Sequence, residues 1–251
     1  SSSPIDYLSA AFSLPNWLIA QWHKDFGLDE TLNICFGSNR RPTVYIRPNR
    51  LKTSADDLAE MFRQAEVDVR PVPEAPVMAV KSPHNIRRLP GFDKGLFTVQ
   101  DLTASLPVAT LAPQPQWKIL DLCAAPGVKT TQIAEITADK ATIIATDINS
   151  KRLDTLRQNV ARLSIESITA VEYEHLDRTF REIGPFDAIL LDVPCSNTGV
   201  LARRVEARHR LKPKTVEDLV KTQSDLLETA AGMISPTGRI CYSTCSALNA
   251  E

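Results

Sequence analysis

The sequence has few of the residues that stabilise secreted or metal-dependent proteins. Its 251 residues include five cysteines and four histidines. These cysteines are too few and too scattered for a disulfide framework, and their odd number leaves at least one thiol free. Because no Cys-x-x-Cys pair occurs and histidine is scarce, we expect no zinc site. We therefore expect the chain to work in a reducing cytoplasm.

Long apolar runs and a strong net charge are also lacking. No stretch approaches the ~18 apolar residues that a membrane span requires, and nothing resembles a signal peptide, so we expect no membrane partner. A formal net charge of −1 does not indicate nucleic-acid binding. Basic side chains nevertheless gather between Arg40 and Lys52 and between Arg203 and Lys214. Each group is either a solvated face or a local stripe that binds phosphates.

The first 90 residues mix helical and strand patterns, which predicts a small α+β domain over residues 1–90. The predicted elements are a helix over 15–26, a strand over 43–47, a helix that Ser54 caps with Asp57 three residues on, and short strands near 67–69 and 77–80. Prolines punctuate this part of the chain and mark strand edges and linkers.

From about residue 91 to residue 251 the pattern alternates between strands and helices. The predicted strands cover 118–122, 141–146, 168–173, 186–191 and 239–244, and a turn is expected at 235–238. The first two predicted helices cover 129–138, with Ile133 and Ile136 inward, and 150–163. A third predicted helix is capped by Thr215 and has an apolar face at Leu219, Val220, Leu226, Leu227 and Ala230. Such alternation predicts an α/β fold whose parallel sheet is covered on both faces. Ligands bind such sheets at the carboxyl ends of the strands.

The first candidate site is the turn between the strand at 118–122 and the next helix. Ala124, Ala125 and Gly127 are small enough for a ligand to approach the backbone closely. The helix that starts after Gly127 offers free N–H groups at its N-terminus. Because the spacing is neither that of a P-loop nor Gly-x-Gly-x-x-Gly, a plain tight turn is the alternative interpretation.

The second candidate is Asp147, which ends the next strand, 26 residues after Asp121. A carboxylate at this position can accept hydrogen bonds from a ribose diol. The alternative is that it caps the following helix, although Asn149 or Ser150 fits that role better.

Two cysteines follow predicted strands at the same edge of the sheet. Cys195 lies in Asp-Val-Pro-Cys and Cys245 in Ser-Thr-Cys. Two thiols at two strand ends suggest chemistry that first forms and then breaks a covalent bond. Spacing alone does not say which thiol attacks. Cys35, Cys123 and Cys241 fit the ordinary role of small buried hydrophobic residues.

These segments in this order closely resemble the RNA cytosine-5 methyltransferases of the bacterial Sun/Fmu type. The matching segments are Tyr45–Asn49, Gly91–Asp101, Leu120–Thr131, Asp147, Asp192–Gly199 and Tyr242–Ser246. The resemblance covers nearly the whole chain from about residue 14. It implies a Rossmann-like class I methyltransferase domain over 91–251 and an RNA-binding role for the domain over 1–90.

The resemblance also implies the cofactor and the roles of the site residues. S-adenosylmethionine would be the methyl donor, held by Cys123, Ala124, Ala125, Pro126, Gly127, Val128, Lys129, Asp147 and Asp192. Cys245 would be the nucleophile that attacks carbon 6 of cytosine, and Cys195 would help to release the product. Asp192 would lie beside the cofactor or the base. Lys129 would either help the nucleophile to ionise or be an ordinary exposed helix residue.

The partner implied by the resemblance is RNA, with rRNA ahead of tRNA. The Arg203–Lys214 cluster follows Cys195 closely, which favours phosphate binding there. One alternative is a non-catalytic RNA-binding or ribosome-assembly factor that keeps the fold. Another is a methyltransferase acting on an exocyclic amine or a small molecule, but that chemistry needs no thiol.

The chain departs from the family pattern in several places. Val128 replaces the second glycine of the usual Pro-Gly-Gly-Lys loop, and His175 stands where an adenine-contacting acid is expected. The segment at 203–208 also differs from the family's usual His-Pro-Asp type. The sequence ends at Glu251 with five principal strands, whereas members usually have seven. We therefore expect this chain to be a fragment whose methyltransferase sheet is truncated at its C-terminal end.

Overall fold

The computed structural model describes residues 3–81 and 85–251 and divides into two compact units. The cysteine unit contains the chain up to Pro42, together with Val193–Leu227 and Thr244–Glu251. The sheet unit contains Thr43–Asp192 and Glu228–Ser243. Each unit therefore gathers segments that are distant in the sequence. The domain boundary expected at residue 90 stays a prediction.

A five-stranded parallel sheet forms the centre of the sheet unit. Its strands are β5 (Lys118–Asp121), β6 (Thr142–Asp147), β7 (Ile168–Glu172), β8 (Phe186–Asp192) and β9 (Ile234–Ser243). They are arranged in the order β7-β6-β5-β8-β9, and every neighbouring pair is parallel. The predicted α/β fold with five principal strands is therefore confirmed.

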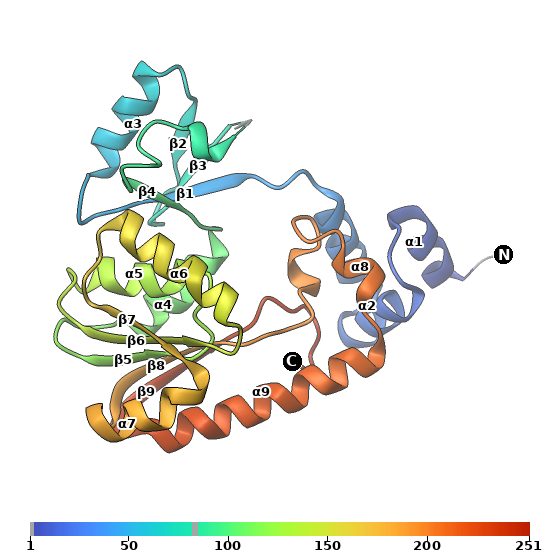
Figure 1. Cartoon of the computed structure of the whole chain (residues 1–251). Coiled ribbons are helices and arrows are strands. Elements are labelled where there is room, and N and C mark those ends of the chain that lie inside the picture. Colours follow the sequence, from blue (N-terminus) through green and yellow to red (C-terminus); the bar gives the residue numbers. More distant parts are fainter. Residues whose placement is uncertain (1–2, 82–84) are drawn as a thin grey trace. The chain divides into compact units, whose positions relative to one another are not determined.

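Helices cover both faces of this sheet. On one face lie α4 (Leu106–Leu111), α5 (Val128–Ile136) and α6 (Ser150–Leu163), and on the other lie α7 (Leu176–Ile183) and the end of α9 (Pro213–Met233) (Figure 1). The core beneath the first layer includes Val108, Ile119, Ile133, Ile143, Leu163 and Leu190. Because both faces are covered, the central strands β5, β6 and β8 bury nearly all of their side chains, whereas the edge strands β7 and β9 are only partly buried.

The strand order reverses at β5, which pairs with β6 on one side and β8 on the other. This reversal is the point at which parallel sheets leave a crevice beyond the strand ends. The carboxyl ends of three neighbouring strands carry acids there, because β5 ends at Asp121, β6 at Asp147 and β8 at Asp192.

A second, antiparallel sheet lies in the same unit, with strand order β2-β3-β1-β4. Its strands are β1 (Val44–Pro48), β2 (Val69–Pro71), β3 (Met78–Val80) and β4 (Phe97–Val99). The helix α3 (Ala55–Gln64) buries Leu58 and Phe62 with apolar residues of these strands. Ser54 caps α3 as predicted, because its Oγ accepts the Asp57 N–H at 3.0 Å.

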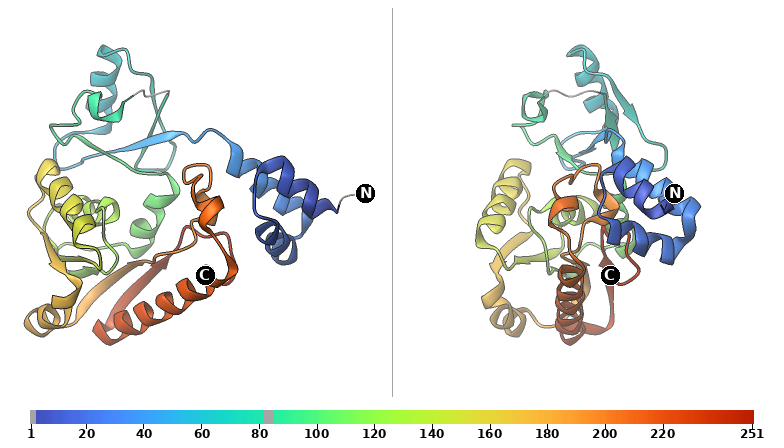
Figure 2. Two further views of the ribbon diagram at one scale, coloured as in Figure 1. Left: turned by 45° about the vertical axis from the view of Figure 1, so that its right-hand side comes forward. Right: turned by 90° about the vertical axis from the view of Figure 1, so that its right-hand side faces the viewer.

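The cysteine unit is mainly helical. It contains α1 (Pro4–Phe12), α2 (Asn16–Asn39), α8 (Ala207–Arg210) and the first part of α9. Figure 2 shows α1 beside α2 in both views. The predicted helix over 15–26 is confirmed and continues beyond a non-helical Gly27. Trp22 is fully buried, and its Nε1 donates to Ala247 O at 2.9 Å, so the last segment of the chain is fastened to α2.

Short 3-10 helices occur at η1 (Ile86–Arg88), η2 (Thr103–Ser105), η3 (Tyr173–His175) and η4 (Thr198–Val200). No helix in the described ranges 3–81 and 85–251 is long and apolar enough to cross a membrane.

Four local predictions were wrong. Ile136, the last residue of α5, is 43% exposed, and Leu227 is 42% exposed although it was expected on the apolar face. The last helix begins at Pro213 and not after Thr215, because proline is well tolerated in the first helical turn. The turn expected at 235–238 lies inside β9, where the register moves from Phe186↔Ile234 to Ala188↔Arg239. The extra residues form an irregularity in the strand.

Candidate active site

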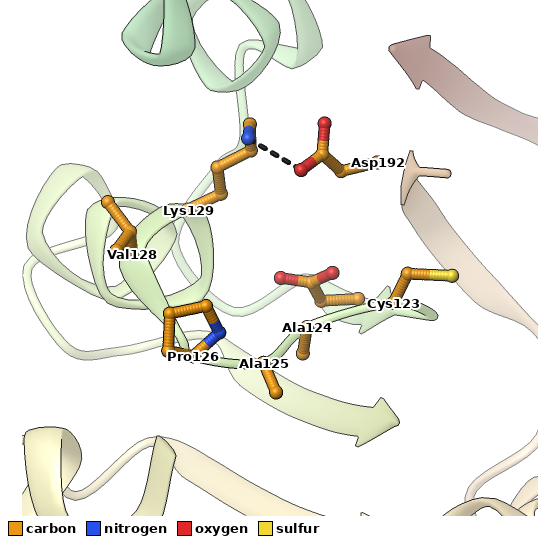
Figure 3. Close-up of a pocket in the computed structure, with 8 residues that line it drawn as sticks. Cys123, Ala124, Ala125, Pro126, Val128, Lys129 and Asp192 are labelled. Atoms are coloured by element: carbon orange, nitrogen blue, oxygen red, sulfur yellow. Dashed lines mark hydrogen bonds and ion pairs between the residues drawn. The ribbon is translucent and has the colours of Figure 1, made fainter. Parts of the chain in front are cut away.

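A pocket lies at the carboxyl ends of β5 and β8 in the sheet unit (Figure 3). Its lining residues are Asp121, Cys123, Ala124, Ala125, Pro126, Val128, Lys129 and Asp192. The structure therefore brings most of the predicted cofactor loop to one cavity. Gly127 and Asp147 belong to the same predicted set but contribute to the pocket indirectly.

Gly127 allows the chain to turn into α5. Its φ of 97° lies in the left-handed region that favours glycine. A Cβ at this position would meet Leu156 Cγ at 2.9 Å. The glycine is therefore needed for the turn and for packing against α6, whereas the sequence had suggested close approach of a ligand. The helix starts at Val128, so the N–H groups of its first turn lie beside the pocket.

Asp147 stabilises the pocket loop through a hydrogen bond to its backbone. Its carboxylate is buried and accepts the Ala125 N–H at 3.2 Å, and it lies 3.4 Å from Arg152 Nη1. Asn149 is the N-cap of α6, because its Oδ1 accepts the Arg152 N–H at 3.1 Å. Asp147 is therefore not the cap of α6, and the expectation that Asn149 fits that role better is confirmed. Ribose binding by Asp147 stays a prediction.

Lys129 and Asp192 form an ion pair across the pocket. Lys129 Nζ lies 2.6 Å from Asp192 Oδ2, and the two side chains point toward one another from α5 and β8 (Figure 3). The other carboxylate oxygen of Asp192 accepts the Ser243 hydroxyl of β9 at 2.6 Å. Only 17% of the Lys129 side chain is exposed, so it is not an ordinary surface residue. The pair fixes the orientation of Asp192, and a catalytic role for Lys129 stays a prediction.

Asp121 is a site residue that the sequence analysis missed. It is 1% exposed, and its Oδ2 accepts the Thr130 hydroxyl at 2.6 Å. Its Oδ1 is buried and has no hydrogen-bond partner among the described residues. The pKa of Asp121 is raised to about 7, chiefly by burial, and the nearby charges of Asp192 and Asp147 contribute in the same direction. The sequence did contain a sign of this residue, because Asp121 is an acid that directly follows the apolar residues Ile119 and Leu120 of β5.

This pocket suits a cationic ligand. Three carboxylates lie close enough to influence one another. Lys129 offsets the charge of Asp192 and Arg152 offsets that of Asp147, whereas Asp121 accepts a hydrogen bond only from the neutral Thr130 hydroxyl among the described side chains. A ligand ammonium group would give Asp121 Oδ1 the partner that it lacks within residues 3–81 and 85–251. S-adenosylmethionine carries both an ammonium and a sulfonium group, so the residues present fit this cofactor.

The two predicted catalytic cysteines are in contact within the cysteine unit. Cys195 Sγ and Cys245 Sγ lie 3.0 Å apart, although 50 positions separate them in the sequence. Asn197 contacts both segments: its Oδ1 accepts the Cys245 S–H at 3.4 Å, and its Nδ2 donates to Cys195 O at 2.9 Å. The structure thus places these two thiols side by side, and their catalytic roles stay predictions.

The contact between the two sulfurs lowers the pKa of Cys195. Hydrogen bonding by Cys245 lowers the pKa of Cys195 to about 6, against the effect of burial, and Thr244 and Asn197 add to it. Burial raises the pKa of Cys35 to about 11 and that of Cys123 to about 12, and it also raises the pKa of Cys241. These three thiols stay protonated at neutral pH, so the pair is chemically distinct from them.

The two basic clusters are weaker than the sequence suggested. Arg47 is 2% exposed and is paired with Glu135, so the expected basic edge from Arg40 to Lys52 is not one continuous surface. Arg208 donates to Phe12 O at 3.1 Å and to Ser38 O at 2.5 Å, so it is a structural residue. Other members of the second cluster are paired with acids: Arg204 and Arg210 with Glu206, and Lys214 with Glu217 and Asp218.

His175 ends η3, and its Nε2 lies 3.7 Å from Glu174 Oε1 on the surface. Both side chains are more than half exposed. The position therefore offers no buried acid for an adenine.

Comparison with known families identifies the chain. Residues 108–251 match the 16S rRNA methyltransferase RsmB/F family, and residues 14–86 match the ferredoxin-like domain of RsmF/B-like methyltransferases. The chain belongs to the RsmB/F methyltransferase family. The predicted resemblance to Sun/Fmu-type enzymes and the Rossmann-like fold with a small N-terminal α+β domain are thereby confirmed. Membership of this family also supports S-adenosylmethionine as the cofactor.

Individual relatives agree with this assignment. The ribosomal RNA small subunit methyltransferase B of Photorhabdus laumondii is 35% identical over 238 residues, which is 94% of this chain and 55% of that protein. The crystal structure of PH0851 matches all of this chain and 58% of its own, with a TM-score of 0.92 and 30% identity. A methyltransferase homologue from Pyrococcus horikoshii has a TM-score of 0.85 and 26% identity, and the match covers 100% of this chain and 79% of that one. This RsmB/F chain thus spans about half the length of the curated relatives that it matches.

Proposed function

We propose that this RsmB/F chain transfers a methyl group from S-adenosylmethionine to carbon 5 of a cytosine in small-subunit rRNA. The contact of 3.0 Å between Cys195 and Cys245 carries the proposal, because neither cofactor binding nor simple amine methylation needs two thiols. Family membership supports the methyl donor and the RNA substrate. The proposed location is the cytoplasm.

The thiol pair supplies the chemistry that cytosine requires. Carbon 5 is too electron-poor to attack a methyl group, and addition of a thiolate at carbon 6 makes it carbanion-like. In the resting pair the two sulfurs lie 3.0 Å apart, either of them can donate the hydrogen bond, and the contact lowers the pKa of Cys195 to about 6. When Cys245 adds to carbon 6, Cys195 accepts the Cys245 proton across this contact. When bound, S-adenosylmethionine would supply the methyl group that carbon 5 takes.

Release of the product requires removal of the carbon-5 proton. Cys195 first loses the proton it accepted to solvent, and as a thiolate it then takes the proton from carbon 5. The electron pair left on carbon 5 forms the 5,6 double bond and expels Cys245 as a thiolate. This sequence gives Cys245 the role of nucleophile and Cys195 that of base, as the family resemblance implies.

The chain itself connects the thiols to the cofactor pocket. Asp192 precedes Cys195 by three positions, and Ser243 precedes Cys245 by two. Asp192 and Ser243 are hydrogen-bonded at the ends of adjacent strands. Along the chain, each thiol therefore follows closely after the residue that ends one of these two strands.

RNA binding is proposed for the exposed basic residues of the cysteine unit. Arg40, Arg41, Arg203 and Lys212 are exposed there. Such residues would contact phosphates, and the target cytosine would have to be unstacked to reach a thiol.

Tritiated methyl transfer tests the proposal. The wild-type chain is incubated with labelled S-adenosylmethionine and total RNA, and the RNA is digested to nucleosides. We expect the label in 5-methylcytidine from small-subunit rRNA. Cys245→Ala should abolish transfer, and Cys195→Ala should accumulate a covalent protein–RNA adduct visible on a denaturing gel.

The outcomes distinguish the alternatives. Full turnover by Cys245→Ala would show that the nucleophile is wrongly assigned. Label in another methylated nucleoside would exclude carbon-5 chemistry. RNA binding without any transfer would favour the non-catalytic RNA-binding or assembly factor.

A further inference from the structure

Three hydroxyl groups, of which two are buried, form a cluster next to the cysteine pair along the chain. Ser196 Oγ lies 3.0 Å from Thr198 Oγ1 and 3.0 Å from Ser246 Oγ, and the last two atoms are 3.1 Å apart. Ser196 and Thr198 are each 1% exposed. The cluster therefore joins the segment after Cys195 to the segment after Cys245 inside the cysteine unit.

The carboxylate of Glu251 accepts hydrogen bonds from this cluster and from α9. Its Oε1 accepts the Ser196 N–H at 2.9 Å and Gln223 Nε2 at 3.0 Å, and its Oε2 accepts the Ser246 hydroxyl at 2.7 Å. Gln223 is 3% exposed, lies in α9, and also donates to Pro194 O at 2.9 Å. Hydrogen bonds to a charged acceptor are stronger than neutral ones, so one carboxylate fastens three segments.

The fastened atoms lie next to both thiols along the chain. Ser196 directly follows Cys195, and Ser246 directly follows Cys245. A further bond closes the other side, because the Gly199 N–H donates to Cys245 O at 2.9 Å. Holding the Cys195 and Cys245 side chains in contact costs conformational entropy in the two loops that carry them. The hydrogen bonds of the adjacent residues offset this cost.

We propose that Glu251 is a positioning residue that holds the Cys195 and Cys245 thiols in contact through Ser196 and Ser246. Glu251 acts through these two residues and touches neither sulfur in the contacts described above. This structural role of Glu251 does not depend on what the protein catalyses. Only the expected effect of Glu251 on catalysis rests on the proposed function.

A trivalent arsenical measures whether the thiols remain adjacent. Phenylarsine oxide condenses with two neighbouring thiols, forming two As–S bonds and releasing one water, with no change in oxidation state. The wild-type chain should capture one arsenical per molecule, detected by native mass spectrometry. Cys195→Ala and Cys245→Ala give the background from the remaining cysteines.

Variants of the network then test Glu251. Glu251→Ala and Ser246→Ala should weaken arsenical capture at least tenfold, and Glu251→Gln should weaken it less, because one acceptor oxygen remains. Glu217→Ala is the matched control, since Glu217 lies on the surface of α9 with its side chain 69% exposed. Urea unfolding of each variant separates misplacement of the thiols from loss of the fold. If Glu251→Ala does not fold, Glu251→Gln and Ser246→Ala decide the question.

A kinetic readout separates positioning from stability. In the methyl-transfer assay Glu251→Gln should lower kcat while KM for RNA and for cofactor stays unchanged, because the thiols and not the binding surfaces are displaced. Unchanged capture by folded Glu251→Gln, Glu251→Ala and Ser246→Ala, with wild-type capture intact, would overturn the role of Glu251 and leave the proposed function standing. Absence of capture by the wild type would instead overturn the thiol pair and the proposed function with it.

Discussion

The buried Arg47–Glu135 pair allows a quantitative test of what holds the pocket loop in place. Arg47 Nε and Nη2 donate to the two carboxylate oxygens of Glu135, each at 2.9 Å, and both side chains are at most 3% exposed. Arg47 also donates to Val128 O and Thr131 Oγ1, each at 3.0 Å, and to Gln100. One guanidinium from β1 thus fixes the first turn of α5, which lines the pocket.

Replacing Arg47 alone should be severe. Arg47→Met leaves the Glu135 carboxylate buried without its partner, which costs about 3–5 kcal/mol of the free energy of unfolding. That is a large share of the roughly 5–15 kcal/mol that stabilises a typical domain. The double variant Arg47→Met/Glu135→Leu removes both charges and should recover most of this loss, because a well-packed apolar pair often replaces a buried ion pair without cost.

Urea unfolding and cofactor binding report two different consequences. Arg47→Met should lower the urea midpoint strongly, with the m-value unchanged, and the double variant should restore it. Affinity for S-adenosylhomocysteine should stay reduced in the double variant, by about tenfold or ~1.4 kcal/mol, because the bonds to Val128 and Thr131 are not restored. Arg63→Met breaks an exposed ion pair with Glu60 and is the matched control, with no measurable shift expected.

A wild-type urea midpoint for Arg47→Met would refute this reasoning. So would a double variant no more stable than the single one. Full recovery of cofactor affinity in the double variant would show that the pair only stabilises the fold.

Three further predictions follow from the pocket and the thiols. The rate of Cys195 alkylation by iodoacetamide should rise with pH around 6, and Cys245→Ala should move this midpoint upward, because the Cys245 hydrogen bond is the main cause of the lowered pKa; an unchanged midpoint would contradict that cause. Gly199→Ala places a Cβ 2.8 Å from Cys245 O and should reduce arsenical capture, whereas Gly37→Ala, with open space around its Cβ, should not; equal capture by the two variants would disprove the close fit. Wild-type affinity for S-adenosylmethionine, measured by calorimetry, should decline as pH falls through about 7, because the Asp121 carboxylate becomes protonated and loses its attraction for a cation. Asp121→Asn should lack this part of the pH dependence. Parallel pH profiles of the wild type and the variant would show that Asp121 does not contribute.

Local sequence patterns predicted most of the elements near the site. The α6 helix spans Ser150–Leu163 as predicted, with Leu153, Leu156 and Leu163 buried, because a strong 3.6-residue apolar period determines both its existence and its inner face. The cap at Ser54 was equally readable, since it depends on residues three positions apart. Short elements such as β4 and α4 were missed because three to six residues carry too little periodicity to be recognised.

Some predictions failed because tertiary contacts override local chemistry. Arg47 sits in a run of basic residues and was expected on a basic surface, but Glu135, 88 positions away, pairs with it in the interior. Arg208 was grouped with phosphate-binding residues, yet two carbonyl oxygens of distant segments accept its hydrogen bonds. Charge counting along the chain contains no information on such partners.

The sequence by itself determined which residues end the strands of the parallel sheet, and so which acids, small residues and cysteines gather at its carboxyl edge. That information is local, because turns and apolar runs are written in consecutive residues. The tertiary structure alone decided the chemical state of those residues. Asp121 has its raised pKa because neighbouring strands exclude water from it, and Cys195 has its lowered pKa because Cys245 is brought to 3.0 Å from 50 positions away. Burial and proximity are properties of the folded chain, since both depend on segments that meet only after folding.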